Sequence, residues 1–178
     1  MHDLYLIAGR TGCGKSSISH KVANQLGLKI LKSYTTRKQR ESELLQSDHI
    51  FINEDEFRTY LHDIVAYTEI NDNKYFSTKQ QLFDSDIYVI DYEGIKYLKE
   101  QHLQDLNLIV IYIYCEPDIR RERYLARDNT DIHMFNERNQ SEFIQFCEME
   151  RFEDYQYIID NTDDMQESIN QLIKIIRK

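Results

Sequence analysis

The residues best suited to chemistry lie near the start of this 178-residue chain. Residues 9–16 read Gly-Arg-Thr-Gly-Cys-Gly-Lys-Ser, fit the pattern G-x-x-x-x-G-K-[ST], and follow the apolar run Leu4 to Ala8. A strand that enters a glycine-rich turn and then a helix points successive backbone N–H groups at one place, where a phosphate can sit. We expect Lys15 to reach the β- and γ-phosphates of a nucleotide and Ser16 to offer its hydroxyl to Mg²⁺. The residues expected to bind this nucleotide are Gly9, Arg10, Thr11, Gly12, Cys13, Gly14, Lys15, Ser16 and Ser17.

A second candidate is the segment 32–40, Lys-Ser-Tyr-Thr-Thr-Arg-Lys-Gln-Arg, which carries four positive charges and no acid in an acidic chain. The simplest interpretation is an exposed basic loop. The segment follows an apolar run, however, and it combines hydroxyls with arginines, which hold small phosphates through charge-assisted, bidentate hydrogen bonds. We therefore favour an anion-binding loop.

Further candidates lie in the second half of the chain. Asp91 ends the apolar run that begins at Asp86, where it could order Mg²⁺, cap the following helix, or do both. A helix that begins near Pro117 and the helix after it carry a group of arginines, namely Arg120, Arg121, Arg123, Arg127 and Arg138. These could equally make surface pairs with nearby acids. The polar stretch 128–131 between the helices resembles a lid hinge.

The elements that must position these residues follow from hydrophobic periodicity. We expect strands at 4–8, 28–31, 48–52, 64–70, 74–77, 86–91, 107–114 and 157–160. We expect helices at 16–26, from the capping box Asn53-x-x-Glu56 to about 61, at 78–83, at 92–101, from about 117 onward and at 164–178. This alternation predicts an α/β protein with a mainly parallel sheet, interrupted by a small β-rich insertion.

Composition narrows the class of protein. At 178 residues and 41% hydrophobic, the chain can bury one substantial core. The net charge of −9 argues against nucleic acid as a partner. Three widely spaced cysteines predict no disulfide framework, and the absence of long apolar stretches predicts a cytoplasmic protein with no membrane partner. The six histidines are scattered, so no structural metal is expected, and the oligomeric state is left open.

Taken together, the chain resembles the guanylate kinases, a family of P-loop nucleoside monophosphate kinases, over nearly its whole length. The motifs occur in the family's order. The phosphate loop is followed by Ser-x-Thr-Thr-Arg-x-x-Arg-x-x-Glu at 33–43, Asn-x-Tyr-x-Ser at 73–77 and Ile-Asp-x-x-Gly at 90–94. The arginine pair Arg127 and Arg138 comes next, and then Ile-Ile-x-Asn at 158–161.

The resemblance implies the P-loop kinase three-layer fold, in which helices flank a mainly parallel sheet. Residues 1–178 would form a single domain whose core comprises about 1–31, 79–126 and 140–178. Residues 32–78 would form a β-rich insertion that binds the phosphate acceptor, and 127–139 a short helical lid. The implied reaction is transfer of the ATP γ-phosphate to GMP, dGMP or a related nucleoside monophosphate, with Mg²⁺ as cofactor.

The resemblance also implies roles for particular residues. Those assigned to the acceptor are Ser33, Arg37, Arg40, Glu43, Glu69, Tyr75 and Ser77. Among them, Arg37, Arg40 and Tyr75 would hold the monophosphate. Those assigned to catalysis are Lys15, Asp91, Arg127 and Arg138, with Ser16 and Asp91 holding Mg²⁺ partly through water.

Three departures concern the acceptor. Ala66 stands where the family has a guanine-reading glutamate, and the next carboxylate is Glu69. His49 replaces a tyrosine that touches the acceptor phosphate, and Val89 replaces an acid. Phosphoryl transfer is therefore better supported than guanine specificity. Two alternatives stay open: a catalytically inactive interaction module, and a P-loop kinase for another small phosphoacceptor.

Overall fold

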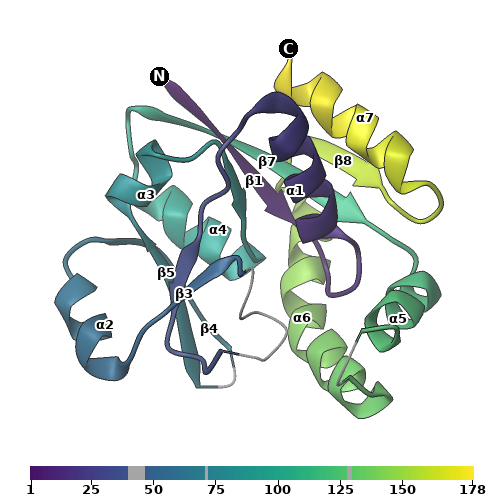
Figure 1. Ribbon diagram of the computed structural model, residues 1–178, viewed down its shortest axis with the longest axis horizontal. Helices are drawn as coiled ribbons and strands as arrows, with labels where there is room; N and C mark the ends of the chain where they lie inside the picture. The colour runs from purple at the N-terminus through teal and green to yellow at the C-terminus, as the bar shows by residue number, and fades with distance from the viewer. Residues whose placement is uncertain (40–46, 71, 128–129) are drawn as a thin grey trace.

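The first of two sheets forms the centre of the molecule and is entirely parallel (Figure 1). The computed structural model describes residues 1–39, 47–70, 72–127 and 130–178. The strand order is β6 (Ile87–Val89), β1 (His2–Ala8), β7 (Leu106–Tyr114), β8 (Tyr157–Asp160). Because all four strands run the same way, their carboxyl ends meet at one edge of the sheet, where α/β proteins bind ligands.

Two hydrophobic clusters cover the two faces of this sheet. In β1, Leu4 and Leu6 belong to one cluster, while Tyr5 and Ile7 belong to the other, because successive side chains of a strand point to opposite faces. The first cluster includes residues of α4 (Tyr92–Glu100) and α6 (Ile132–Phe152), and the second includes residues of α1 (Lys15–Leu26) and α7 (Met165–Ile176). The expected α/β layers are thus confirmed. None of the helices in the described ranges is long and apolar enough to cross a bilayer.

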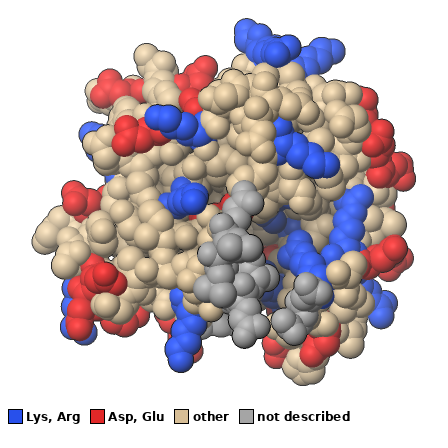
Figure 2. Space-filling view, in the orientation of Figure 1, with Lys and Arg blue, Asp and Glu red and all other residues tan. Residues whose placement is uncertain are grey.

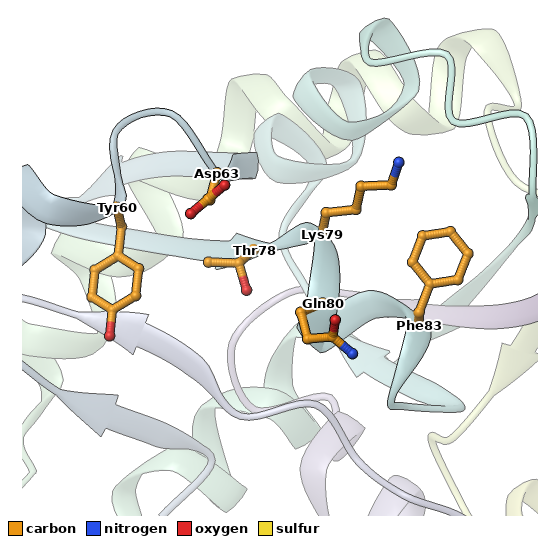
Figure 3. Close-up of a pocket in the computed structure, with 6 residues that line it drawn as sticks. All are labelled: Tyr60, Asp63, Thr78, Lys79, Gln80 and Phe83. Atoms are coloured by element: carbon orange, nitrogen blue, oxygen red, sulfur yellow. The ribbon is translucent and has the colours of Figure 1, made fainter.

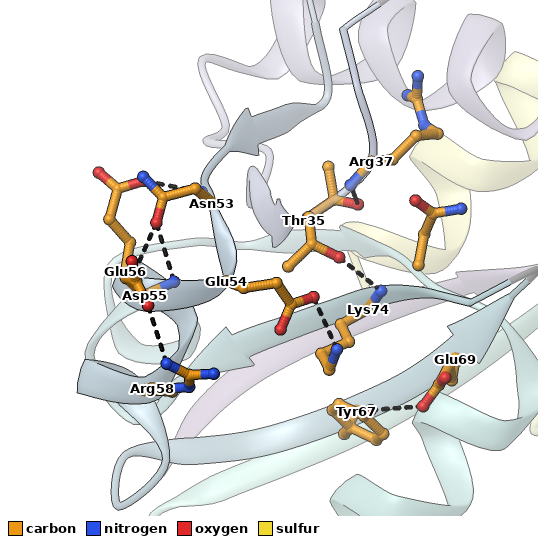
Figure 4. A network of polar contacts seen from close by, with 12 residues as sticks. Thr35, Arg37, Asn53, Glu54, Asp55, Glu56, Arg58, Tyr67, Glu69 and Lys74 are labelled. Carbon is orange, nitrogen blue, oxygen red and sulfur yellow. Dashed lines mark hydrogen bonds and ion pairs between the residues drawn. The ribbon is translucent and has the colours of Figure 1, made fainter.

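The second sheet lies to the side of the first and is built from the middle of the chain (Figure 1). Its order is β3 (His49–Phe51), β2 (Ser33–Thr35), β5 (Asn73–Thr78), β4 (Ile64–Ile70), with the expected antiparallel hairpin between β4 and β5. The short helices are α2 (Glu54–Tyr60) and α3 (Lys79–Phe83). Asn53 and Glu56 form the expected capping box at the start of α2 (Figure 4).

The expected strand at 28–31 was wrong. After α1 the chain runs beside β6, but only Ile30 forms a bridge, to Ile87. Leu31 donates its N–H to the Ile87 carbonyl at 2.8 Å and is buried, and the chain then leaves for the second sheet. The apolar run therefore reflects burial at a sheet edge and not a full strand.

Two other boundaries differ from expectation. The strand expected at 86–91 ends at Val89, and Asp91 caps α4. The helix α5 (Pro117–Leu125) ends before Arg127, which follows the C-cap residue Ala126. Arg138 lies in α6, which runs from Ile132 to Phe152 as one helix.

The hydrogen bonds that cap α2 allow us to predict how much stability is lost when the cap is removed. Asn53 Oδ1 accepts hydrogen bonds from the N–H groups of Asp55 and Glu56, both at 2.9 Å. We expect Asn53→Ala to lower the free energy of unfolding by about 1 kcal/mol, measured by urea denaturation. The control Asn170→Ala changes an exposed asparagine within α7 and should cost less than half as much. Equal effects of the two substitutions would contradict the capping role.

Candidate functional site

A cavity of about 800 Å³ lies between the phosphate loop, residues 9–16, and the second sheet. Most of the residues singled out from the sequence line it, from both sides. The lining includes Gly9, Thr11, Gly12, Gly14, Lys15, Ser16, Ser17, Ser33, Arg37, Tyr75, Asp91, Arg127 and Arg138. Segments far apart in the chain thus meet at one hollow, and Figure 2 shows basic side chains gathered near the junction of α5 and α6.

The phosphate loop keeps its shape through glycines and one buried side chain. Gly12 has φ of +84°, and a Cβ there would lie 2.3 Å from the carbonyl oxygen of Arg120. Asn161, fully buried, donates from Nδ2 to the Cys13 carbonyl at 2.8 Å. Gly14 precedes α1 in a left-handed conformation, and no side chain caps that helix. The first N–H groups of α1 are therefore open to an anion.

Lys15 lies folded over this loop. Its Nζ donates to the carbonyls of Gly9 at 2.5 Å and Arg10 at 3.2 Å, so the ammonium sits at the mouth of the phosphate loop. A cation in this place can bind the oxygens of a phosphate by exchanging these carbonyl partners.

Asp91 also lines the cavity, follows β6 next to the end of β1, and caps α4. Its Oδ1 accepts the Gly94 N–H at 2.7 Å, which confirms the expected capping role. Burial raises the pKa of the Asp91 carboxyl above its ordinary value, and this outweighs the opposing effects of the Gly94 N–H and the Lys15 charge. Burial therefore makes the charged form of Asp91 less favourable than that of an exposed aspartate.

The second sheet contributes a cation and hydroxyls. Arg37 donates from Nε to the Tyr75 hydroxyl at 3.1 Å, and its guanidinium lies 5.3 Å from the centroid of the Phe51 ring. Ser33 Oγ and His49 Nδ1 are 2.8 Å apart. The structure thus brings Arg37 and Tyr75 together as the sequence suggested. Arg40 and Glu43 lie outside the described residues.

Four of the expected site residues are absent from the described lining of this cavity. Arg10 turns away to bind Glu150 of α6 at 3.1 Å, and Cys13 is fully buried. Ser77 is fully buried in β5. The Glu69 carboxylate accepts the Tyr67 hydroxyl at 3.0 Å on the β4 strand (Figure 4).

Sequence reasoning missed two contacts at the cavity. His20 Nε2 and Asp48 Oδ1 are 2.6 Å apart and join α1 to the second sheet. Glu142 of α6 binds Thr11 of the phosphate loop. Each missed residue lies four positions after a residue that was singled out, His20 after Ser16 and Glu142 after Arg138. This spacing places both on the same helical face as the known candidate, which is the signal that could have found them.

A second, smaller hollow of about 410 Å³ lies away from the phosphate loop, between the end of α2 and the start of α3 (Figure 3). Tyr60, Asp63 and Phe83 line it, and Lys79 Nζ lies 5.8 Å from the centroid of the Phe83 ring. None of the residues singled out for chemistry lines this hollow within the described ranges, so the larger cavity is the candidate site.

Comparisons with known proteins agree on one family. The family model described as guanylate kinase matches residues 1–178. A guanylate kinase of Salmonella typhi is 26% identical over 186 residues, covering 98% of this chain and 86% of the relative. One from Fusobacterium nucleatum is 26% identical over 181 residues, covering 97% and 95%. The crystal structure of guanylate kinase from Anaplasma phagocytophilum matches with a TM-score of 0.66 at 20% identity, over 99% of this chain and 85% of that one, and supports the fold.

The raised pKa of Asp91 predicts that replacing its carboxyl by a neutral group increases the free energy of unfolding, and that the increase depends on pH. Asp91→Asn keeps an oxygen for the Gly94 N–H but removes a charge that burial disfavours. Because the folded-state pKa is raised, the wild type loses stability as the pH rises from the ordinary aspartate pKa of 3.8 through the folded value. We therefore expect the variant to be the more stable protein at neutral pH, with the difference shrinking toward about pH 4.

The measurement is urea unfolding of both proteins across this pH range in the presence of a chelator. The matched control is Asp84→Asn, which changes an exposed carboxylate at the end of α3. A variant that is less stable than the wild type at neutral pH would contradict the cost assigned to the Asp91 charge.

Proposed function

The chain belongs to the guanylate kinase family, and from that premise we propose that it transfers the γ-phosphoryl group of ATP to a nucleoside 5′-monophosphate, giving ADP and a nucleoside diphosphate. The observation that carries this proposal is that Lys15 and the Arg37–Tyr75 pair line the same cavity. One cation lies at the phosphate loop and the other on the second sheet, so that one hollow has an anchor for each of two phosphorylated substrates.

The reaction needs little covalent help from the protein. An enzyme of this kind aligns the donor and acceptor oxygens in line and offsets the charge on the moving phosphoryl group. Lys15 and the open N–H groups of α1 bind the donor phosphates, and Arg37 with Tyr75 binds the acceptor phosphate. Arg127 and Arg138, which line the same cavity, add positive charge where the group moves.

The residues at the cavity also suit a magnesium ion. The Ser16 hydroxyl and the Asp91 carboxylate line the same hollow, and oxygen donors of this kind are what Mg²⁺ prefers. When bound, the ion neutralises charge on the nucleotide phosphates. In this proposal, residues 32–78 act as the acceptor-binding insertion and 127–139 as the lid. Arg40, Glu43, Glu69 and Ser77 stay predicted acceptor residues, and Arg10 and Cys13 predicted ATP-binding residues.

GMP and dGMP are the first acceptors to test, because the relatives carry the name guanylate kinase. Ala66, however, is buried and pairs with Ser77 across the hairpin, so no carboxylate stands there to accept the N–H groups of guanine. Val89 likewise has no carboxylate. These two residues favour a related nucleoside monophosphate, or another small phosphoacceptor, as the second candidate. The three free cysteines fit the reducing cytoplasm, where we propose that the protein acts.

A coupled assay that detects ADP tests the proposal. The purified chain is given ATP, Mg²⁺ and a panel of ribonucleoside and deoxyribonucleoside monophosphates, with other small phosphorylated and hydroxylated metabolites as a second panel. We expect turnover with at least one nucleoside monophosphate. Turnover confined to the second panel would show that the acceptor is not a nucleoside monophosphate. No turnover with either panel, at enzyme concentrations high enough to detect a single turnover, would favour the inactive interaction module.

Lys15 supplies the first mutational prediction. Lys15→Ala should lower kcat by roughly 10²-fold or more, because the ammonium that faces the donor phosphates is removed. The melting temperature should change little, since the side chain packs in no apolar core. Lys29→Ala, which removes an exposed lysine after α1, is the control and should retain activity. Comparable activity in the Lys15 variant would refute the donor site.

Arg37 separates the two substrates. Arg37→Ala should raise the KM of the acceptor by roughly 10-fold or more and change the KM of ATP little, because its guanidinium lies on the acceptor side of the cavity. The neighbouring Lys38→Ala removes an exposed cation and serves as the control. Steady-state kinetics with each substrate varied in turn provide the measurement, and an equal loss for both substrates would count against the division of the site.

A further inference from the structure

Thr11 of the phosphate loop is hydrogen-bonded to the carboxylate of Glu142, which lies 131 residues later in the chain, on α6. Glu142 Oε2 accepts the Thr11 N–H at 2.7 Å, and Glu142 Oε1 accepts the Thr11 hydroxyl at 2.5 Å. Both residues line the large cavity, together with Lys15. Thr11 is 6% exposed, so its remaining access is through this hollow. A negatively charged group therefore already occupies two hydrogen-bond donors of the loop.

These two donors are of the kind that bind phosphates. A backbone N–H and a hydroxyl in a glycine-rich turn donate to any anionic oxygen that reaches them, and a carboxylate oxygen and a phosphate oxygen are equivalent acceptors in this respect. A nucleotide that enters the same cavity brings several negative charges close to Glu142. Like charges at such a distance repel, and the two anions compete for the same N–H and hydroxyl.

The contact also reaches α5 and α6, between which Arg127 lies and of which α6 carries Arg138. The Thr11 carbonyl accepts Arg120 Nη1 at 3.2 Å, and Arg120 Nη2 donates to Asn139 Oδ1 at 3.0 Å. Asn139 lies three positions before Glu142 on α6, and Arg138 is its neighbour. The donor groups and the carbonyl of Thr11 are thus tied to α5 and α6. Loss of the Glu142 contact leaves α6 joined to Thr11 through Arg120.

We propose that Glu142 is an internal anion that occupies the phosphate loop at Thr11 until a nucleotide displaces it, so that this residue sets the affinity of the loop for ATP. The proposal rests on the assignment of the phosphate loop as the ATP site. Molecules in which Glu142 holds Thr11 are not competent to bind ATP fully, and the apparent dissociation constant equals the intrinsic one divided by the fraction of molecules in which Thr11 is free.

The test is the affinity for ATP of two variants of the full chain, measured by isothermal titration calorimetry with a chelator present. Glu142→Gln keeps the size of the side chain and removes its charge, whereas Glu142→Ala removes the contact. Each should bind ATP roughly 5- to 10-fold more tightly than the wild type, because the competing anion is gone. Circular dichroism melting identifies any variant that fails to fold, and the second variant then carries the test.

The matched control is Glu137→Gln, which removes the same charge from α6 where the carboxylate is 64% exposed and pairs with His133. It should bind ATP like the wild type. Unchanged or weaker binding by the Glu142 variants would overturn the proposal, as would equal tightening in the control. If those variants fail while the wild type binds ATP and turns over, the proposed function stands. If neither the wild type nor any variant binds ATP, this proposal and the proposed function are both refuted.

Discussion

The turn from β1 into α1 must keep its backbone N–H groups aimed into one cavity, and much of the molecule serves this requirement. The turn lies where the parallel strands end, which places it at the carboxyl edge of the sheet. Asn161, which follows β8, donates a hydrogen bond to the Cys13 carbonyl. The backbone of α5 packs so close to Gly12 that no side chain fits at this position. The phosphate loop is therefore held by elements that lie more than 100 residues later in the chain.

The second sheet faces this turn and has aromatic packing of its own, although Val65 and Ala66 of β4 also belong to the cluster that includes α4 and α6. Phe76 is fully buried, and the centroids of the Phe76 and Phe57 rings are 5.3 Å apart, so the second sheet and α2 share a small aromatic cluster. Near the cavity it reaches the main body through the His20–Asp48 pair. In the proposed function, the main sheet would hold the donor phosphates while the second sheet presents Arg37 to the acceptor.

Local features of the fold could be predicted from the sequence, and distant contacts could not. The glycine pattern of the phosphate loop, the capping box at Asn53 and the β4–β5 hairpin each give a local sequence signal, so these features could be located from neighbouring residues. The run 28–31 was misassigned because burial beside β6 gives the same apolar signal as a strand. The spacing of Glu142 from Arg138 places Glu142 on the right face of its helix, but the partners of Arg10 and Glu142 could not be predicted from local pattern, because each lies more than 130 residues away in sequence.

The central claim is that two cationic anchors face one migrating phosphoryl group. A crystal structure with a bisubstrate analogue, in which a polyphosphate joins adenosine to the 5′ carbon of a second nucleoside, tests it most directly. The account predicts one analogue per chain, with its polyphosphate running from Lys15 to the guanidinium of Arg37 across the cavity. A polyphosphate that contacts Lys15 but leaves the cavity without approaching Arg37 or Tyr75 would contradict it.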